Sequence, residues 1–382
     1  MSSLSPPPPR ELPADAIREI LLRIPPDEPE SLVRASLVRK SWRRVLTDPT
    51  FCRHYRDFHR TPPMLGYLCN DNDHYFNISS RFLSTAAFCP RQRPGGGWSA
   101  ISARHGRALF QDTTTRSNDL FLWVWDPVTD WKFRLPVFPR RPEGFSAAVL
   151  CGKAGCDHRG CHGGDPFFVA IVGTNDDGVT SARVYSTEAG AWSDMTSIDH
   201  VSPEYGMRSS VLVGDSLYFL YEPSTKILRY DLAGRQLSVI HRPKACGING
   251  CYCNIVLMAT EDGALGFAGV HGSTFSMWSM STDRYFCKTK QHTVPFTPWV
   301  ERRVVELATV LPPRALQARP LVNGFVEGAG IIILGTNEEI FTIEINSGRV
   351  KKISNRRSAA LYITPYTSFY TLDLAKNAMK MG

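Results

Sequence analysis

The most constraining feature of this chain is a short strand–turn–strand element that recurs between residues 124 and 374. In each copy an aromatic or apolar residue ends one strand, a small polar turn follows, and a second strand begins. The copies, of which the last is partial, are residues 124–131, 184–192, 229–235, 277–283, 343–349 and 370–374. The turns of the full copies are 60, 45, 48 and 65 residues apart. A period of about 40–50 residues with several strands is typical of a β-propeller, whose blades stack because none can bury both faces alone.

The repeats also predict the number of blades. The five full copies predict five blades, and residues 65–115 together with C-terminal strands at 360–364 and 366–372 supply a sixth. Seven blades are the alternative count and a β-sandwich is the alternative fold, although the recurring turn favours the propeller. The longest spacings contain insertions at 151–166 and 284–320, and such loops on one rim are where we expect target recognition.

The first sixty residues have a helical pattern instead. Ile17, Ile20, Leu21 and Ile24 recur at helical spacing, and prolines separate this run from later apolar runs. We therefore expect three or four short amphipathic helices. A unit of about fifty residues buries only about 60% of its unfolded surface, and its apolar positions outnumber those that one small core can use. The bundle therefore packs on the next domain, offers an apolar face to a partner, or does both.

These patterns predict an α+β chain organised as two domains, a small all-α bundle followed by an all-β propeller. The expected segments are a disordered Ser/Pro tail at 1–9, the bundle at 10–60, the propeller at 64–374 and a basic tail at 375–382.

Composition and charge narrow the functional classes. The chain is 43% hydrophobic and 21% charged, as in a soluble globular protein, and we expect no membrane span and no secretory signal. The net charge of +8 is concentrated in residues 10–60, at +3, and 349–382, at +6, which leaves −1 for the large centre. This distribution disfavours nucleic-acid binding. We expect the ten cysteines to be reduced, in the cytoplasm, the nucleus or both.

The N-terminal helical segment resembles an F-box of the type common in large plant families. The matching residues are Glu11, Leu12, Pro13, Ile17, Ile20 to Pro25, Leu32 to Val38, Lys40 to Arg43, Phe51 to Tyr55 and His59 to Pro63. The rest of the chain is more loosely similar to the propeller-type F-box-associated domain of plants. Two features depart from the family pattern: Arg39 stands where many members have Cys, which would alter one adaptor contact, and residues 26–29 lengthen the first turn.

The resemblance implies a substrate receptor of a Skp–cullin–F-box ubiquitin ligase. The F-box would bind a Skp-type adaptor, and through it a cullin, while the propeller would capture a protein target for ubiquitination. The adaptor-binding residues that the resemblance implies are Leu12, Pro13, Ile17, Ile20, Leu21, Leu32, Val33, Leu37, Val38 and Trp42. The alternative is that these residues form only the core of the bundle. We expect a split, with the core taking mostly Ile20, Ile24, Trp42 and Val45 and the interface taking mostly Leu12, Pro13 and part of the second helix.

No residue set has the spacing of a catalytic site. Residues 144–148 lack the second glycine of a nucleophile elbow, and the glycines at 95–97 are not followed by the Lys-Ser/Thr of a phosphate loop. We therefore expect a protein that is not an enzyme and needs no cofactor. The alternatives are a propeller-based small-molecule binder or enzyme with a helical cap, and a nucleic-acid binder acting through the basic tail.

One insertion concentrates residue types that bind metals. Within twelve residues it holds Cys151, Cys156, His158, Cys161 and His162. These could supply the four ligands of tetrahedral zinc, but the spacing lacks the short Cys pair of standard zinc motifs. A Gly-rich loop with ordinary thiols is the alternative, and the sequence assigns no metal ligand. A looser group of three cysteines at 246–253 is expected at strand and turn positions.

Overall fold

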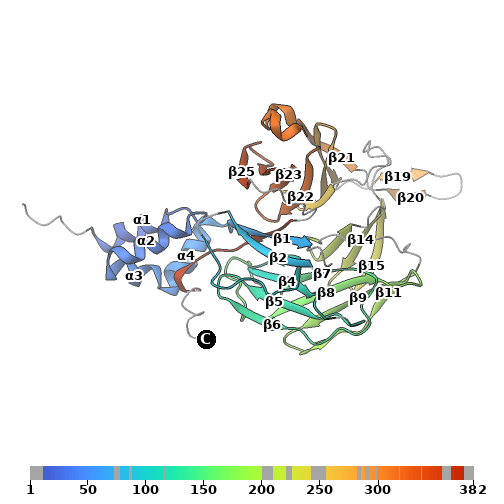
Figure 1. Ribbon diagram of the computed structural model, residues 1–382, viewed down its shortest axis with the longest axis horizontal. Helices are drawn as coiled ribbons and strands as arrows, with labels where there is room; N and C mark the ends of the chain where they lie inside the picture. The colour runs from blue at the N-terminus through green and yellow to red at the C-terminus, as the bar shows by residue number, and fades with distance from the viewer. Residues whose placement is uncertain are drawn as a thin grey trace, which may run out of the picture.

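The structure is a computed structural model of the chain, and Figure 1 shows a helical unit beside a larger body of strands. It describes residues 12–72, 78–85, 88–115, 117–199, 210–220, 226–241, 255–281, 285–288, 293–296, 299–317, 319–336, 338–354 and 363–373. The predicted tails at 1–9 and 375–382 lie outside these residues. Within the described part of the chain, no helix has the length and apolar character that crossing a membrane requires.

Four short helices form the N-terminal unit. They are α1 (Ala14–Leu22), α2 (Pro29–Val38), α3 (Lys40–Leu46) and α4 (Pro49–His59). Local chemistry explains several helix starts. Pro29 and Pro49 occupy first-turn positions, where a missing backbone N–H costs little. The Asp48 carboxylate accepts a hydrogen bond from the backbone N–H of Thr50 at 3.1 Å and so caps α4. The prediction of three or four short helices is confirmed, because the described N-terminal residues form four.

The described strands after the helices form six antiparallel blades and one separate two-stranded sheet. Blade one contains β1 (Met64–Asn72), β2 (Ile78–Ser84) and β26 (Ile363–Thr367). Blade two contains β3 (Trp98–Arg104), β4 (Arg107–Asp112), β5 (Leu122–Asp126) and β6 (Trp131–Arg134). Blade three contains β7 (Gly144–Cys151), β8 (Phe167–Thr174), β9 (Thr180–Ser186), β10 (Ala191–Trp192) and β11 (Thr196–Ile198).

The second half of the ring follows the same plan. Blade four contains β12 (Val211–Val213), β13 (Ser216–Leu220), β14 (Lys226–Asp231) and β15 (Gln236–His241). Blade five contains β16 (Ile255–Ala259), β17 (Leu265–His271), β18 (Thr274–Met280) and β21 (Trp299–Glu306). Blade six contains β22 (Leu321–Val326), β23 (Ile331–Gly335), β24 (Ile340–Glu344) and β25 (Val350–Ser354). The predicted two-domain α+β fold with a propeller of about six blades is confirmed.

In blades two, three, four and six the recurring sequence element is the turn between the third and fourth strands. In blade two, the Asp126 carboxylate accepts hydrogen bonds from the backbone N–H groups of Val128 and Thr129 at 2.9 and 3.2 Å. In blade four, Asp231 accepts one from Gly234 at 2.6 Å. In these two copies a short acidic side chain therefore caps its own turn. The spacing between copies therefore measures one blade.

The insertion predicted at 284–320 is only partly an insertion. A hairpin of β19 (Tyr285–Lys288) and β20 (Thr293–Phe296) interrupts blade five, but β21 then returns to pair with β18 as the fourth strand. Two 3-10 helices, η1 (Leu307–Thr309) and η2 (Pro313–Leu316), lead on to blade six. The sequence pattern did not separate this delayed strand from the loop before it.

Buried apolar clusters fill the gaps between neighbouring blades. Pairs that share a cluster are, going around the ring, Leu68 with Phe110, Leu109 with Val149, Ala148 with Leu217, Leu220 with Ile255, Met258 with Val322, and Ile333 with Tyr67. Each sheet thus buries both faces against its neighbours, which is why a propeller must close on itself.

The C-terminal strand closes the ring. In blade one β1 lies between β2 and β26, with Met64 opposite Thr367 and Cys69 opposite Ile363. The predicted sharing of a blade between the two ends of the β domain is therefore confirmed. Its predicted extent, 65–115, was too long, because β3 and β4 begin the four-stranded sheet of blade two.

Removing the closing strand should open the ring. We expect a chain ending at residue 354 to lose cooperative unfolding, or to melt roughly 10 °C or more lower, because β1 loses its partner and two inter-blade clusters lose their cover. Thermal unfolding followed by circular dichroism measures this. A chain ending at residue 373 is the matched control, since it keeps β26. Equal melting of the two chains would show that closure by β26 contributes little.

Candidate functional site

The helical unit has a core that the end of the propeller chain completes. The buried cluster contains Leu21, Leu22, Leu32, Ala35, Leu46, Phe51, Tyr55 and Phe369. Phe369 lies beyond β26 and is 1% exposed, and its ring meets that of Tyr55 edge-on with centroids 6.4 Å apart. Figure 1 shows this red C-terminal segment beside α4. The bundle therefore packs on the second domain, which is one of the two uses that we expected for its surplus apolar residues.

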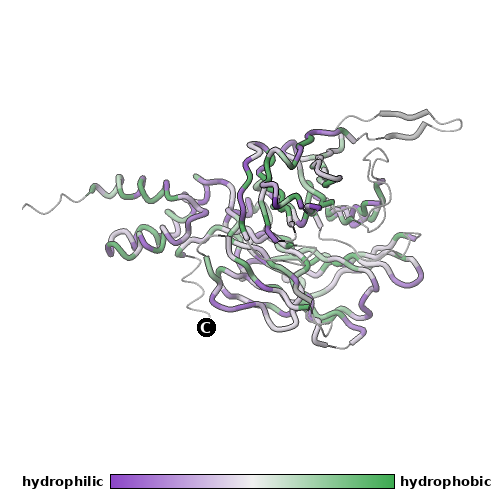
Figure 2. The backbone as a smooth tube through the Cα atoms, turned by 45° about the horizontal axis from the view of Figure 1, so that its top comes forward, coloured by the Kyte–Doolittle hydropathy of each residue, from purple (hydrophilic) through white to green (hydrophobic). Residues whose placement is uncertain are grey.

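A second set of apolar side chains on the helical unit is exposed. The exposed fractions of Leu12, Ile20, Leu37 and Val38 are 51%, 47%, 77% and 59%, and Pro13 is also exposed. Figure 2 shows apolar and polar stretches alternating along the helices. Several large exposed aliphatic groups on so small a unit mark it as a candidate interaction surface.

The structure places part of the predicted adaptor-binding set in the core of the bundle. Leu21 and Leu32 are 0% and 3% exposed, so they serve the core and cannot reach a partner without unfolding. Ile20, which we expected mostly in the core, is exposed because the buried face of α1 is centred on Leu21 and Leu22, and Ile20 lies about 100° or more away around the helix.

Three further residues of the predicted adaptor-binding set are neither fully buried nor fully exposed. The half-buried members of the set are Ile17, Val33 and Trp42. Ile24, Trp42 and Val45 pack against the bundle core, as expected. Ile17 packs there as well. Phe58 on α4 was not predicted as an exposed residue. It is 48% exposed, although it follows the buried Phe51 and Tyr55 at helical spacing.

Polar contacts fasten α4 to the propeller. The Arg56 guanidinium, 12% exposed, donates a hydrogen bond to the Thr371 hydroxyl at 3.0 Å and lies 3.4 Å from the Asp373 carboxylate. Arg159, in the loop between β7 and β8, lies 3.2 Å from the Asp57 carboxylate. The helical unit is therefore held from two sides, by the chain end and by a loop of blade three.

That loop, residues 152–166, is anchored by buried charged groups of blade two. Arg107, 0% exposed, donates hydrogen bonds to the backbone carbonyls of His162 and Asp165 at 2.5 and 3.0 Å. The Asp126 carboxylate accepts one from the backbone N–H of Gly163 at 2.8 Å, and burial raises the pKa of Asp126. The insertion that we expected to face a target thus lies at the junction with the helices.

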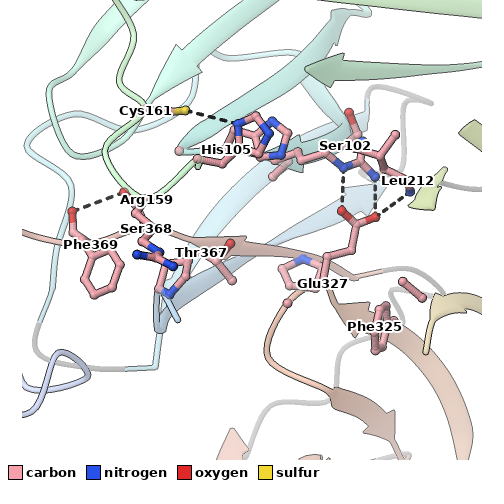
Figure 3. Close-up of a pocket in the computed structure, with 18 of the residues that line it drawn as sticks. Ser102, His105, Arg159, Cys161, Leu212, Phe325, Glu327, Thr367, Ser368 and Phe369 are labelled. Carbon is pink, nitrogen blue, oxygen red and sulfur yellow. Dashed lines mark hydrogen bonds and ion pairs between the residues drawn. The ribbon is translucent and has the colours of Figure 1, made fainter. Parts of the chain in front are cut away.

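A cavity of about 320 Å³ lies near the centre of the propeller, where blades two, four and six meet. Figure 3 shows Glu327 reaching across it. The Glu327 carboxylate binds Arg104 through two contacts of 2.5 and 2.6 Å and accepts the backbone N–H of Leu212 at 3.2 Å. Arg104 also donates to the Ser210 carbonyl at 3.0 Å. Arg104 and Glu327, two of the charged residues that line this cavity, therefore neutralise each other.

His105 forms another wall of the cavity. Its ring stacks on that of His158 with centroids 3.9 Å apart, and its Nδ1 accepts the backbone N–H of Cys151 at 3.1 Å. Burial, with help from the neighbouring His158 and arginine charges, lowers the pKa of His105 to about 2. The imidazole is therefore neutral at physiological pH and already engaged in structural contacts, which suits a wall residue better than a general base.

The candidate metal ligands of the sequence analysis meet in this region. One ligand atom from each of Cys151, Cys156, His158 and Cys161 lies within 4.8 Å of the other three. His162 is apart from them, with Nε2 3.6 Å from the Asp165 carboxylate. The cysteines at 246–253 lie outside the described residues.

The sequence analysis missed the contacts that join distant segments. Arg104 and Glu327 are 223 positions apart, and Arg56 and Asp373 are 317 apart. Each residue has an ordinary local context, so no short-range signal predicts its partner. Only the strand register that closes the ring brings them together.

Breaking the central ion pair should destabilise the propeller. Glu327→Gln leaves Arg104, which is 4% exposed, without its counter-charge, and we expect a loss of about 2–4 kcal/mol in the free energy of unfolding. Urea denaturation measures it. The matched control is Glu30→Gln, which removes the exposed Arg34 pair and should cost about 0.5 kcal/mol or less. Equal effects of the two changes would refute a structural role for the central pair.

A family comparison agrees with this architecture. The family described as "F-box protein AT5G49610-like, beta-propeller" matches residues 100–370. A comparison with curated proteins gave no match. Among solved structures, the periplasmic gluconolactonase PpgL of Pseudomonas aeruginosa is 12% identical with a TM-score of 0.41, covering 76% of this chain and 82% of that one. Sqt1 of Saccharomyces cerevisiae is 12% identical with a TM-score of 0.35, covering 68% of this chain and 60% of that one.

Because the family match spans most of the chain, the protein belongs to the family of F-box proteins with an AT5G49610-like β-propeller.

Proposed function

We propose that this protein is the substrate-receptor subunit of a plant Skp–cullin–F-box ubiquitin ligase, acting in the cytoplasm or nucleus. In this proposal the helical unit is the F-box and binds a Skp-type adaptor, and the propeller captures a protein target. The observation that carries the proposal is a helical unit with exposed aliphatic groups, attached to a propeller of an F-box protein family.

The division of the helical unit into buried and exposed apolar side chains supports the adaptor-binding part of the proposal. Its buried side chains are used for its own core and for the contact with Phe369, so binding a partner does not require the bundle to open. Four exposed aliphatic side chains remain available to a partner. They are Leu12 just before α1, Ile20 on α1, and Leu37 and Val38 on α2. Burying such groups in a complex is favourable by about 25 cal/mol per Å² of apolar surface.

The firm junction suits catalysis by proximity. A ligase receptor has to hold its target at a defined position relative to the ubiquitin-conjugating enzyme, and a fixed geometry gives a higher effective concentration than a flexible linker. Phe369, Arg56 and Arg159 fix α4 to the propeller through one apolar and two polar contacts. The protein therefore needs no catalytic residues of its own in this role.

The alternative function, a small-molecule binder or enzyme, would use the central cavity. Its charged groups argue against that use, because Arg104 already binds Glu327 and the Ser210 carbonyl, and burial keeps His105 neutral. A polar ligand would have to displace these internal contacts in order to bind.

The test is binding to purified Skp-type adaptors of plants. We expect the wild-type chain to bind, and a Leu37→Asp, Val38→Asp variant to bind at least roughly tenfold more weakly because charges replace apolar contact surface. Isothermal titration calorimetry measures both. Met195→Asp, which adds a charge at an exposed position of the propeller, is the control and should bind like wild type. Thermal melting has to be unchanged in all three proteins.

Two outcomes would overturn the proposal. The first is a folded wild-type chain that binds no adaptor tested, which would make the helical unit a structural cap. The second is equal weakening by the α2 variant and by Met195→Asp, which would show that the effect is general rather than local to the helices.

A further inference from the structure

The loop between β7 and β8 brings together three thiols and an imidazole. The Sγ atoms of Cys156 and Cys161 are 3.5 Å apart, and Cys161 Sγ is 3.8 Å from Nδ1 of His158. With Zn–S near 2.3 Å and Zn–N near 2.0–2.1 Å, a tetrahedral site separates two sulfurs by about 3.8 Å and a sulfur from a nitrogen by about 3.6 Å. These two separations are close to the tetrahedral values, and Cys151 Sγ lies within 4.8 Å of the other three ligand atoms, so the four groups are near enough to share one ion.

The chemistry of the four groups favours zinc over calcium and magnesium. Three thiolates and one imidazole form a Cys3His set, which is one of the usual structural zinc sets, whereas calcium and magnesium require oxygen ligands. Backbone N–H groups also point at two of the sulfurs. Lys153 donates toward Cys151 and His158 toward Cys156, each at 3.4 Å. Such donors stabilise the thiolate form that binds a metal.

The surroundings hold the ligands in place. Cys151 is fixed as the last residue of β7, and its backbone N–H is bonded to His105, whose ring stacks on His158. Gly106, with φ of 72°, leaves room for the loop, since a Cβ there would lie 2.8 Å from the Cys161 carbonyl oxygen. His158 itself has φ of 61°, a conformation that costs energy for a residue with a side chain and that clusters at ligand sites.

A disulfide explains these positions less well. The distance of 3.5 Å between Cys156 and Cys161 is well beyond the S–S bond length of about 2.05 Å, and a disulfide would use two of the thiols and leave Cys151 and His158 unexplained.

We propose that Cys151, Cys156, His158 and Cys161 bind one structural zinc ion that fixes the β7–β8 loop against helix α4. Arg159 and Gly160 lie between the last two ligands, and both meet α4. Arg159 pairs with Asp57, and a Cβ on Gly160 would lie 3.3 Å from the Arg56 guanidinium. The ion thus sets the shape of the segment that holds the helical unit, whether or not that unit binds an adaptor.

Metal analysis of the full-length protein tests this proposal. The protein is purified under reducing conditions, supplied with zinc, freed of excess metal and of any histidine tag, and analysed by mass spectrometry for metals. We expect about one zinc per chain for wild type, and less than roughly 0.2 for Cys156→Ser and Cys161→Ser. Cys89→Ser is the matched control, because Cys89 is exposed and outside the cluster, and it should keep the full zinc content.

Cobalt substitution of the wild-type chain keeps the test independent of variant folding. Co²⁺ bound by three thiolates and one imidazole gives strong visible absorption of tetrahedral type together with thiolate charge-transfer bands, and zinc should displace it. Hydrogen exchange should then show residues 152–166 and α4 exchanging faster after metal removal than with zinc bound. A wild-type chain that takes up no zinc and shows no thiolate–cobalt bands would overturn the proposal. So would intact-mass and alkylation data showing Cys156 disulfide-bonded to Cys161, or zinc loss in Cys89→Ser equal to that in Cys161→Ser.

Discussion

The packing of each blade against its two neighbours is the constraint on which the rest of the structure depends. A four-stranded sheet with apolar residues on both faces is stable only between two other sheets, so the row of blades has to close. Closure pairs β26 with β1, with Met64 opposite Thr367. Because this pairing is antiparallel, the chain leaves β26 where β1 begins, which is also where α4 ends. Ring closure therefore delivers Phe369 and Thr371 to the helical unit.

The junction between the two domains follows from that geometry. Phe369 enters the core of the bundle, and Arg56 binds the chain end beyond it. The β7–β8 loop adds a contact from the other side through Arg159, and Arg107 and Asp126 hold that loop from blade two. A helical unit fixed in this way presents its exposed aliphatic groups at a constant position relative to the propeller, which a receptor that works by proximity requires.

The candidate sites differ in how far the sequence could predict them. The surplus of apolar residues in a small bundle predicted an available apolar face, and the F-box resemblance placed Leu12, Leu37 and Val38 on it, but the helical pattern did not separate Ile20 from Leu21. Neighbouring residues on a helix differ by about 100° in direction, and which of them faces inward depends on where the other helices and Phe369 lie. The concentration of Cys and His residues in the loop could be recognised from the sequence. That four of them lie close together could not, because this depends on β7 placing Cys151 beside the other three residues.

The sequence by itself determined the two kinds of periodicity, the helical repeat before residue 60 and the strand–turn repeat after it, and hence an α+β chain with a propeller of about six blades. Those signals are local, since they depend on residues a few positions apart. The tertiary structure alone decided which strand closes the ring, that Arg104 meets Glu327, and that the 151–166 insertion contacts α4. These contacts join residues more than 100 positions apart, and only the closed ring brings such residues within reach of one another.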